Sequence, residues 1–454
     1  MRRPHPVKNT AAALVAGLAA LSVAACGDST SAGGAAGGAS GVAQDKTSML
    51  EIWVRKPAGS NSEKTAMKIA ETFTASSGVP TKVTALFEDF ETKLQQAAAQ
   101  KNLPDIVIND TGQLGGLVSQ GLVRAVNKDD IDGADSLTPI SWQAAQGADG
   151  AYHAVPFSAQ SFALFIRSDW RAKVDLEVPR TWAELDALAA AFTTADPDGN
   201  GKADTYGYVV PGSTKRGYTS WYLSSFLWSG GGDFISGSDG AFAPAIADAE
   251  SVAAVDWFKD QFCDAGTVAP GAVTMETTQA HPLFEAGQAG IYLTGPYNMA
   301  RFDKSLGKDK YEVVPAPPGP GGESVSLAEG ENVYLMAGSA NEAGQEAFAE
   351  FAISTEGQTI GMAGDTDGGI VRLPVNATVD LASVRTDARW QTFEAIYQSS
   401  GRYIPAVPDW TPFRQASADT INAIVADCDS DTKAELDKLA QTFGAELEKQ
   451  GVAG

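Results

Sequence analysis

Acidic and amide side chains alternate with glycines in the stretch DPDGNGKADTYG (196–207), a pattern that could hold a calcium ion. Calcium prefers oxygen ligands, and five residues would supply them here: Asp196, Asp198, Asn200, Lys202 through its backbone carbonyl, and Asp204. Gly207 stands where an EF-hand carries a bidentate glutamate, so the loop is not an EF-hand. The alternative is a turn without metal, because Asp, Asn and Gly dominate turns. We therefore expect no required cofactor and, at most, a structural calcium ion.

Motifs of catalysis are scarce in the rest of the chain. Three histidines are present, without a Gly-x-Ser-x-Gly elbow and without a histidine pair or CxxC at transition-metal spacing. The segment GNGK (199–202) lacks the first glycine and the Ser or Thr of a phosphate loop. The sequence thus predicts a binding protein rather than an enzyme. A secreted glycoside hydrolase is the enzymatic alternative, since carboxylates are plentiful and that chemistry needs only two.

Aromatic residues beside Gly, Pro or Asp form a second group with chemical potential. The set is Trp53, Trp221, Trp228, Tyr297, Tyr403 and Trp410. Aromatic faces stack on the C–H faces of sugars, while Asp, Glu, Asn and Gln bridge sugar hydroxyls. The alternative for any single member is core packing, which is the usual place of large aromatic side chains. Together the residues favour a carbohydrate ligand.

The elements that must position these residues follow an alternating pattern. Strands are expected at 50–54, 81–86 and 105–110, with a helix after Ser60 and another near 90–100. Strand, helix, strand, helix, strand predicts a parallel sheet covered by helices. Ser60 with Glu63, and Thr181 with Glu184, have the spacing of capping boxes at two helix starts. Further strands are expected at 289–295, 311–317 and 332–338.

The N-terminus is typical of an exported lipoprotein. A basic start and a short apolar stretch over residues 1–25 predict a signal peptide, and small residues followed by Cys26 resemble a bacterial lipobox, in which that cysteine carries the lipid. An ordinary signal peptide is the alternative. Residues 26–48, rich in Gly, Ser and Ala, then read as a flexible tether. We expect a body anchored to the outer face of the cell membrane.

The composition of the chain limits which partners, disulfides and domain numbers can be expected. The formal net charge is −23, which argues against nucleic acid because phosphate binding needs a basic face. Beyond Cys26 the chain holds two cysteines, Cys263 and Cys428. Outside the cell they could pair, and two separate buried thiols are the alternative. The length of 454 residues suggests two or three domains.

Several segments, taken in order, resemble one known family. They are LPDIVIND, VPFSAQSFALFIRSDW, PRTWAEL, LWSGGGDF, FEAGQAGIYLTGPY, VVPAPPGPGG and GENVYLMAG. From about residue 49 to 448 the chain is similar to the extracellular solute-binding lipoproteins of ABC sugar importers, the class that includes maltose-binding protein. The resemblance implies an α/β, two-lobe periplasmic-binding-protein-like fold of class II type, with a multi-strand hinge. It also implies a Gram-positive source, because the lipobox and tether anchor such proteins there.

The resemblance further implies where the lobes divide. The N-terminal lobe would comprise 49–158 plus 297–330, and the C-terminal lobe 159–296 plus 331–454. Hinge crossings would lie near 156–162, 294–298 and 328–335. A ligand would bind between the lobes, which close around it. The closed form, as a monomer, would deliver the ligand to the permease of the transporter.

Ligand-binding residues are carried over by local match only. The candidates are Trp53, Glu88, Asn109, Asp110, Gln113, Gln160, Trp228, Tyr297 and Trp410. Gln160 departs from the acid that maltose binders often carry, which leaves the sugar open. Tyr297 in TGPY takes the place of a stacking tryptophan. The implied ligand is a carbohydrate, most simply an oligosaccharide, and the alternative is another solute such as a peptide or a glycerol phosphate ester.

Overall fold

A mixed sheet forms the centre of the first part of the body in the computed structural model, which describes residues 44–238 and 240–454. The signal peptide, Cys26 and most of the tether lie outside the described residues. The strand order is β12-β4-β11-β3-β1-β2. The strands are β1 (Leu50–Arg55), β2 (Thr81–Leu86), β3 (Ile106–Asp110), β4 (Val155–Ser161), β11 (Ser326–Leu335) and β12 (Leu373–Pro374), with β13 (Gly401–Arg402) paired to β11. Strands β1, β2 and β3 are parallel, as predicted.

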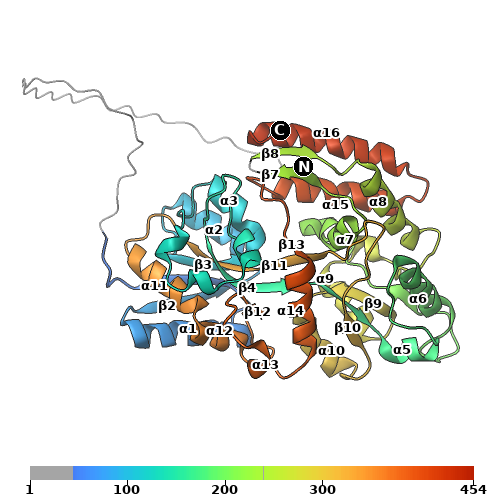
Figure 1. The fold of residues 1–454 in the computed structure, drawn as a ribbon, viewed down its shortest axis with the longest axis horizontal. Coiled ribbons are helices and arrows are strands. Elements are labelled where there is room, and N and C mark those ends of the chain that lie inside the picture. The colour runs from blue at the N-terminus through green and yellow to red at the C-terminus, as the bar shows by residue number, and fades with distance from the viewer. Residues whose placement is uncertain (1–43, 239) are drawn as a thin grey trace, which may run out of the picture. The chain divides into compact units, whose positions relative to one another are not determined.

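Helices pack around this sheet and with it make up what we call the first lobe (Figure 1). They are α1 (Asn61–Ser77), α2 (Phe90–Ala99), α3 (Leu114–Ser119), α4 (Pro139–Gln143), α11 (Glu342–Ile353), α12 (Thr355–Met362) and α13 (Leu381–Val384). The apolar stripe of α1 is buried as the spacing predicts. From that stripe, Phe73 meets Phe348 of α11 edge-on, with ring centroids 5.3 Å apart.

A second sheet, in the order β10-β5-β9-β6, defines the second lobe. Its strands are β5 (Ala163–Ile166), β6 (Tyr206–Tyr208), β9 (Ala289–Thr294) and β10 (Glu312–Val314), and a hairpin of β7 (Ile235–Ser238) and β8 (Ala241–Pro244) lies apart from them. The helices are α5 (Ser168–Lys173), α6 (Trp182–Thr194), α7 (Tyr218–Ser229), α8 (Ala249–Phe262), α9 (Thr277–Glu285), α10 (Met299–Ser305), α15 (Thr411–Ala426) and α16 (Thr432–Gln450).

The predicted helix starts are confirmed with one refinement. The side chain of Ser60 accepts a hydrogen bond from the backbone N–H of Glu63, and Thr181 accepts one from Glu184. Each glutamate carboxylate, however, accepts from the residue before the N-cap, Gly59 or Arg180, rather than from the N-cap itself. Both helices still begin where the sequence predicts, because the N-cap bond is local.

The predicted division into lobes, which puts 297–330 in the first lobe, is wrong for residues 299–314. The chain leaves the first sheet after β4 and enters the second at β5, as expected, but it does not return near 294–298. Strand β10 pairs with β5, and Phe302 of α10 packs against Phe165 and Phe284 of the second lobe. Burial of this apolar surface holds residues 299–314 in the second lobe.

The chain returns to the first lobe along β11, and much of the stretch after it stays there. Residues Glu331 to Leu335 pair with β3, and α11 and α12 pack on α1, so the assignment of all of 331–454 to the second lobe is also wrong. Helix α14 (Arg389–Ser400), central in Figure 1, packs on β4, β10 and β11. It therefore contacts both sheets at the crossing.

Gly330 marks the crossing of the two long strands. A Cβ on this residue would lie 1.8 Å from the carbonyl oxygen of Ser158 in β4, and its φ is +156°. Only glycine permits such a close backbone approach. The register of β11 against β4 shifts just beyond it, between Glu331 and Asn332. Position 329, the neighbour of this contact, is thereby fixed at the junction of the lobes.

Candidate functional site

The carboxyl ends of β1, β2 and β3 form one wall of the site. These parallel strands end at the same edge of the sheet, where ligands of α/β proteins bind. Nη1 of Arg55, at the end of β1, donates to Oδ2 of Asp110, at the end of β3, over 3.0 Å. Nε of Arg55 also lies 3.4 Å from Oε1 of Glu91 in the first turn of α2. The first lobe thus presents a fixed guanidinium between two carboxylates.

Glu329 of β11 is the point where the two lobes meet. Its Oε1 accepts a hydrogen bond from the indole Nε1–H of Trp221 in α7, over 2.7 Å. Its Oε2 accepts one from the side-chain amide of Gln160, its partner in β4, over 3.2 Å. Burial raises the pKa of Glu329 to about 7, and the charge of Asp110 adds to this, while both hydrogen bonds oppose it. We call Glu329, Trp221 and Gln160 the central triad.

Two tyrosines and an arginine complete the surroundings of the central triad. The charge of Glu329 acts on both Tyr297 and Tyr403, whose pKa values burial raises above the ordinary range. Arg414 of α15 is close enough to Asp110 for the two charges to interact across the lobes, although burial lowers the pKa of its guanidinium. Aromatic rings, carboxylates, amides and guanidinium groups therefore converge from both lobes on one place.

Hollows lined by both lobes adjoin this place. One lies between the start of α3 and the segment 403–407, with Trp410 at its border. Another, of about 390 Å³, lies between the loop 146–150, the β7–β8 hairpin and residues 402–406. A Cβ on Gly115 of α3 would lie 2.6 Å from the carbonyl oxygen of Pro408, so the two backbones touch there. The lobes are in contact at the edge of the site.

Several residues predicted as ligand contacts lie at or beside the central triad. Asp110, Gln160 and Tyr297 are brought together with Glu329, as described above. Asn109 is buried, and its side chain accepts the backbone N–H of Asp110, so it positions that residue. Gln113 lies half-buried in the short 3₁₀ turn after Asp110, and Glu88 is exposed in the β2–α2 loop. Contact of these side chains with a ligand stays a prediction.

The three tryptophans among the candidates are held by packing. Trp53 lies within β1, where it meets Phe90 edge-on and donates to Glu51. Trp228 is 3% exposed and donates to Asp233. Trp410 is 8% exposed and stacks on Phe413, with centroids 5.6 Å apart. All three tryptophans therefore have the packing contacts of core residues, which is the alternative to a role in ligand binding. Trp410 in addition borders a hollow.

Sequence reasoning found Asp110 but missed three other charged residues of the site, Arg55, Glu329 and Arg414. Arg55 follows strand 50–54 just as Asp110 ends strand 105–110, so the rule that located Asp110 could also have found Arg55. Trp221 and Tyr403 stood out as aromatics but were not among the ligand candidates. No local signal marks Glu329 or Arg414, because each reaches the site only through contacts across more than a hundred residues.

The calcium loop folds as a turn with internal hydrogen bonds. Both carboxylate oxygens of Asp196 accept backbone N–H groups, from Gly199, Asn200 and Gly201. The amide nitrogen of Asn200 donates to Asp198 and Asp204. Within residues 44–238 and 240–454, no group of three or more His, Cys, Asp or Glu side chains is arranged to hold a metal ion. In this structure the loop has the internal hydrogen bonds of a turn without metal, and calcium binding stays a prediction.

Calcium would fit this loop if the Asn200 amide turned its oxygen inward, toward Asp198 and Asp204. We then expect millimolar calcium to raise the melting temperature by a few degrees relative to EDTA, since a ligand of the folded state alone stabilises it. Differential scanning fluorimetry would measure this, with Asp198→Ala as the variant that loses the effect. Identical melting in calcium and EDTA would leave a turn without metal.

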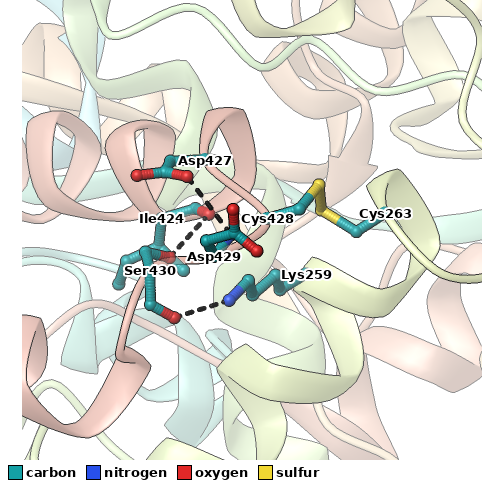
Figure 2. Close-up of a disulfide and its surroundings, with 7 residues drawn as sticks. All are labelled: Lys259, Cys263, Ile424, Asp427, Cys428, Asp429 and Ser430. Carbon is teal, nitrogen blue, oxygen red and sulfur yellow. Dashed lines mark hydrogen bonds between the residues drawn. A yellow bond between two sulfur atoms is a disulfide. The ribbon is translucent and has the colours of Figure 1, made fainter.

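Cys263 and Cys428 form a disulfide (Figure 2), which decides between the two alternatives in favour of pairing. Their Cα atoms are 5.7 Å apart, within the ordinary range. Cys263 follows α8 and Cys428 lies in the loop between α15 and α16. Nearby, Nζ of Lys259 donates to the carbonyl of Ser430 over 2.7 Å. The bridge therefore joins α8 to the C-terminal helices within the second lobe.

Comparison with known proteins assigns the family. The model of the family "Bacterial extracellular solute-binding protein" matches residues 59–359, which is more than half of the chain. The chain belongs to this family. Its members are binding proteins, so the prediction that the chain is not an enzyme is confirmed.

Individual relatives agree with this assignment. The chain is 24% identical, over 78% of both lengths, to the maltooligosaccharide ABC transporter solute-binding lipoprotein of Streptococcus pneumoniae R6. It is 30% identical over 186 residues to the polygalacturonan/rhamnogalacturonan-binding protein YtcQ of Bacillus subtilis, of whose length it spans only about a third. The GacH receptor of Streptomyces glaucescens superimposes with a TM-score of 0.74 at 18% identity, over 89% of this chain and 99% of that one. The predicted two-lobe fold is confirmed.

Proposed function

We propose that this protein is the solute-binding component of an ABC importer and captures a saccharide between its two lobes. The observation that carries the proposal is the convergence of the central triad with Asp110, Tyr297 and Tyr403. Carboxylates and amides can bridge sugar hydroxyls, and aromatic rings can cover the apolar faces of the sugar. Buried polar groups left unpaired are costly, so such a site discriminates strongly among solutes. The relatives named for maltooligosaccharide and polygalacturonan support a carbohydrate ligand.

The proposal extends to location and partners. The lipobox cysteine, Cys26, would hold a lipid at the outer face of the membrane, and the tether would let the body reach the permease. Relatives named as lipoproteins support this anchoring. In the part of the chain that the structure describes, no helix has the length and hydrophobicity needed to cross a membrane.

A thermal-shift screen tests the proposal. The full mature chain would be melted with monosaccharides, malto-oligosaccharides, fructo-oligosaccharides and oligogalacturonides, and with short peptides and glycerol phosphate esters as competing solute classes. We expect a saccharide to raise the melting temperature, because at 100 times Kd a ligand adds about 2.7 kcal/mol to the stability. A shift with peptides or phosphate esters and none with saccharides would overturn the proposal.

The variant Asp110→Ala tests whether the ligand binds in the proposed site. The variant removes a carboxylate from the wall of the site and leaves Arg55 with Glu91 alone. We expect at least a fivefold loss of affinity for the saccharide, measured by isothermal titration calorimetry, since an unpaired buried polar group costs about 1–3 kcal/mol. Asp309→Ala, an exposed carboxylate of the second lobe, is the matched control. Equal affinities of the two variants would place the ligand elsewhere.

A further inference from the structure

Phe87 is an exposed aromatic ring at the binding edge of the first lobe. It directly follows β2, whose last residue is the register partner of Arg55. The side chain is 41% exposed, which is unusual for a phenyl ring. The guanidinium of Arg55 lies over the ring, 5.0 Å from its centroid. Because Asp110 and Glu91 fix Arg55 in turn, the Arg55 guanidinium holds the ring in place while much of it stays exposed.

Three polar atoms, on Arg55, on its neighbour Glu91 and on α15, could take a hydroxyl group of a ligand. Arg55 Nε, Glu91 Oε1 and Arg414 Nε make no hydrogen bond among the described residues. Arg55 Nε and Glu91 Oε1 face each other at 3.4 Å as an ion pair without hydrogen-bond geometry, which leaves Arg414 Nε unpaired among the described residues. Buried polar atoms are nearly always hydrogen-bonded, so the unpaired Arg414 Nε beside this loose ion pair indicates a place for a ligand hydroxyl. Two of the atoms are donors and one is an acceptor. They come from both lobes, and Glu91 is near enough to Arg414 to act on its charge.

The chemistry of these atoms describes what would satisfy them. A hydroxyl group can donate to Glu91 Oε1 and also accept from an arginine Nε. The C–H face of a sugar ring could at the same time cover Phe87. Two guanidinium groups, of Arg55 and Arg414, face two carboxylates, of Asp110 and Glu91, so the charges balance. An uncharged sugar ring fits this environment better than an acidic or basic one.

We propose that Phe87, Glu91 and Arg414 form an outer subsite for an uncharged sugar ring, next to the site around the central triad. The ligand is then an oligosaccharide with at least two rings, one in each place. This inference rests on the proposed function and adds the length and charge of the ligand to it.

Phe87→Ala tests the outer subsite through its dependence on ligand length. The probes are glucose and malto-oligosaccharides of two to seven units, and a second neutral series, the fructo-oligosaccharides, titrated by calorimetry. For the longer members we expect affinity to fall about 5- to 10-fold, as about 1–1.4 kcal/mol of lost aromatic contact implies. For the shortest member that binds, we expect a change within about twofold. Phe87→Trp keeps a stacking face and is expected to retain affinity for all lengths.

Met67→Ala is the matched control, since Met67 is similarly exposed, at 43%, but lies on α1. An unchanged affinity of Phe87→Ala for long ligands, or an equal loss at every length, would overturn the subsite. So would a wild-type protein that binds single rings as tightly as longer chains, or that binds only acidic oligosaccharides. Failure of the wild type to bind any saccharide in the broader screen would instead overturn the proposed function itself.

Discussion

Removal of the Cys263–Cys428 disulfide is expected to lower the stability of the second lobe by about 3–5 kcal/mol. The bridge joins residues 165 positions apart, and closing so long a loop restricts the unfolded chain strongly, by about 5 kcal/mol in the chain-entropy model. For a lobe of this size, such a loss corresponds to a fall in melting temperature on the order of 10 °C. The measurement is calorimetry of the double variant Cys263→Ser, Cys428→Ser beside the wild type.

Chemical reduction of the wild type distinguishes the effect of the disulfide bond on stability from the effect of replacing the two cysteine side chains. Cys428 is exposed, so a small thiol reductant can reach the bond, and the reduced wild type should melt near the double variant. The double variant itself should not respond to reductant. Because both cysteines lie away from the central triad, saccharide affinity well below the melting temperature should change less than about twofold. Equal melting of oxidised and reduced wild type would show that the bridge contributes nothing.

The parts of the fold that were predicted correctly depend on local sequence. Helix starts at Ser60 and Thr181 follow from one side chain that accepts a neighbouring N–H. The strands around Ile52 and Ile108 follow from short apolar runs between turns. Such signals are readable because the interacting residues lie within a few positions of one another.

The division into lobes could not be predicted from local sequence. A strand such as β10 carries no mark of which sheet it joins, and its place depends on β5, almost 150 residues earlier in the chain. Placing it required knowledge of which apolar surfaces meet, here those of Phe165, Phe284 and Phe302. The family resemblance supplied the two-lobe plan and the crossing near 328–335, but it placed a crossing near 294–298 where the chain stays in the second lobe.

The candidate site shows the same difference between local and distant information. Asp110 was found because polar residues at the carboxyl ends of parallel strands share one edge. Glu329 was not, because it is significant only through Trp221 and Gln160, which lie on other elements. A lone glutamate in an acidic chain gives no sign that it lies half-buried between two lobes.

Replacement of Glu329 by glutamine is expected to remove a pH dependence of stability between about pH 4.5 and 7. Burial raises the pKa of Glu329 to about 7 in the folded protein, whereas in the unfolded chain it is near the ordinary value of about 4.3. Between these values the folded state keeps a proton that the unfolded state has lost. The stability contributed by Glu329 is therefore full below about pH 4 and declines as pH rises to about 7. The total decline would be about 3–4 kcal/mol.

Glutamine imitates the protonated form of Glu329 at every pH. Its carbonyl can accept from Trp221, and its amide can pair with Gln160 if that residue turns its own amide. Unfolding free energies of wild type and Glu329→Gln, measured by urea titration from pH 4 to 8.5, should agree at the acidic end. The variant should become the more stable form by about 3–4 kcal/mol well above pH 7.

The difference between the two curves isolates Glu329 from the other groups that titrate. His281 is buried, which lowers its pKa to about 3, so the unfolded chain gains a proton there first and stability falls as pH drops below about 6.5. This slope is opposite in sign to that of Glu329, but it is common to both proteins and cancels in the difference. Parallel curves would show that Glu329 titrates normally and is open to solvent, which would contradict its place at the junction of the lobes. A difference that grows with pH and levels off near pH 7 would confirm that the central triad holds an uncharged carboxyl group at the point where the lobes meet.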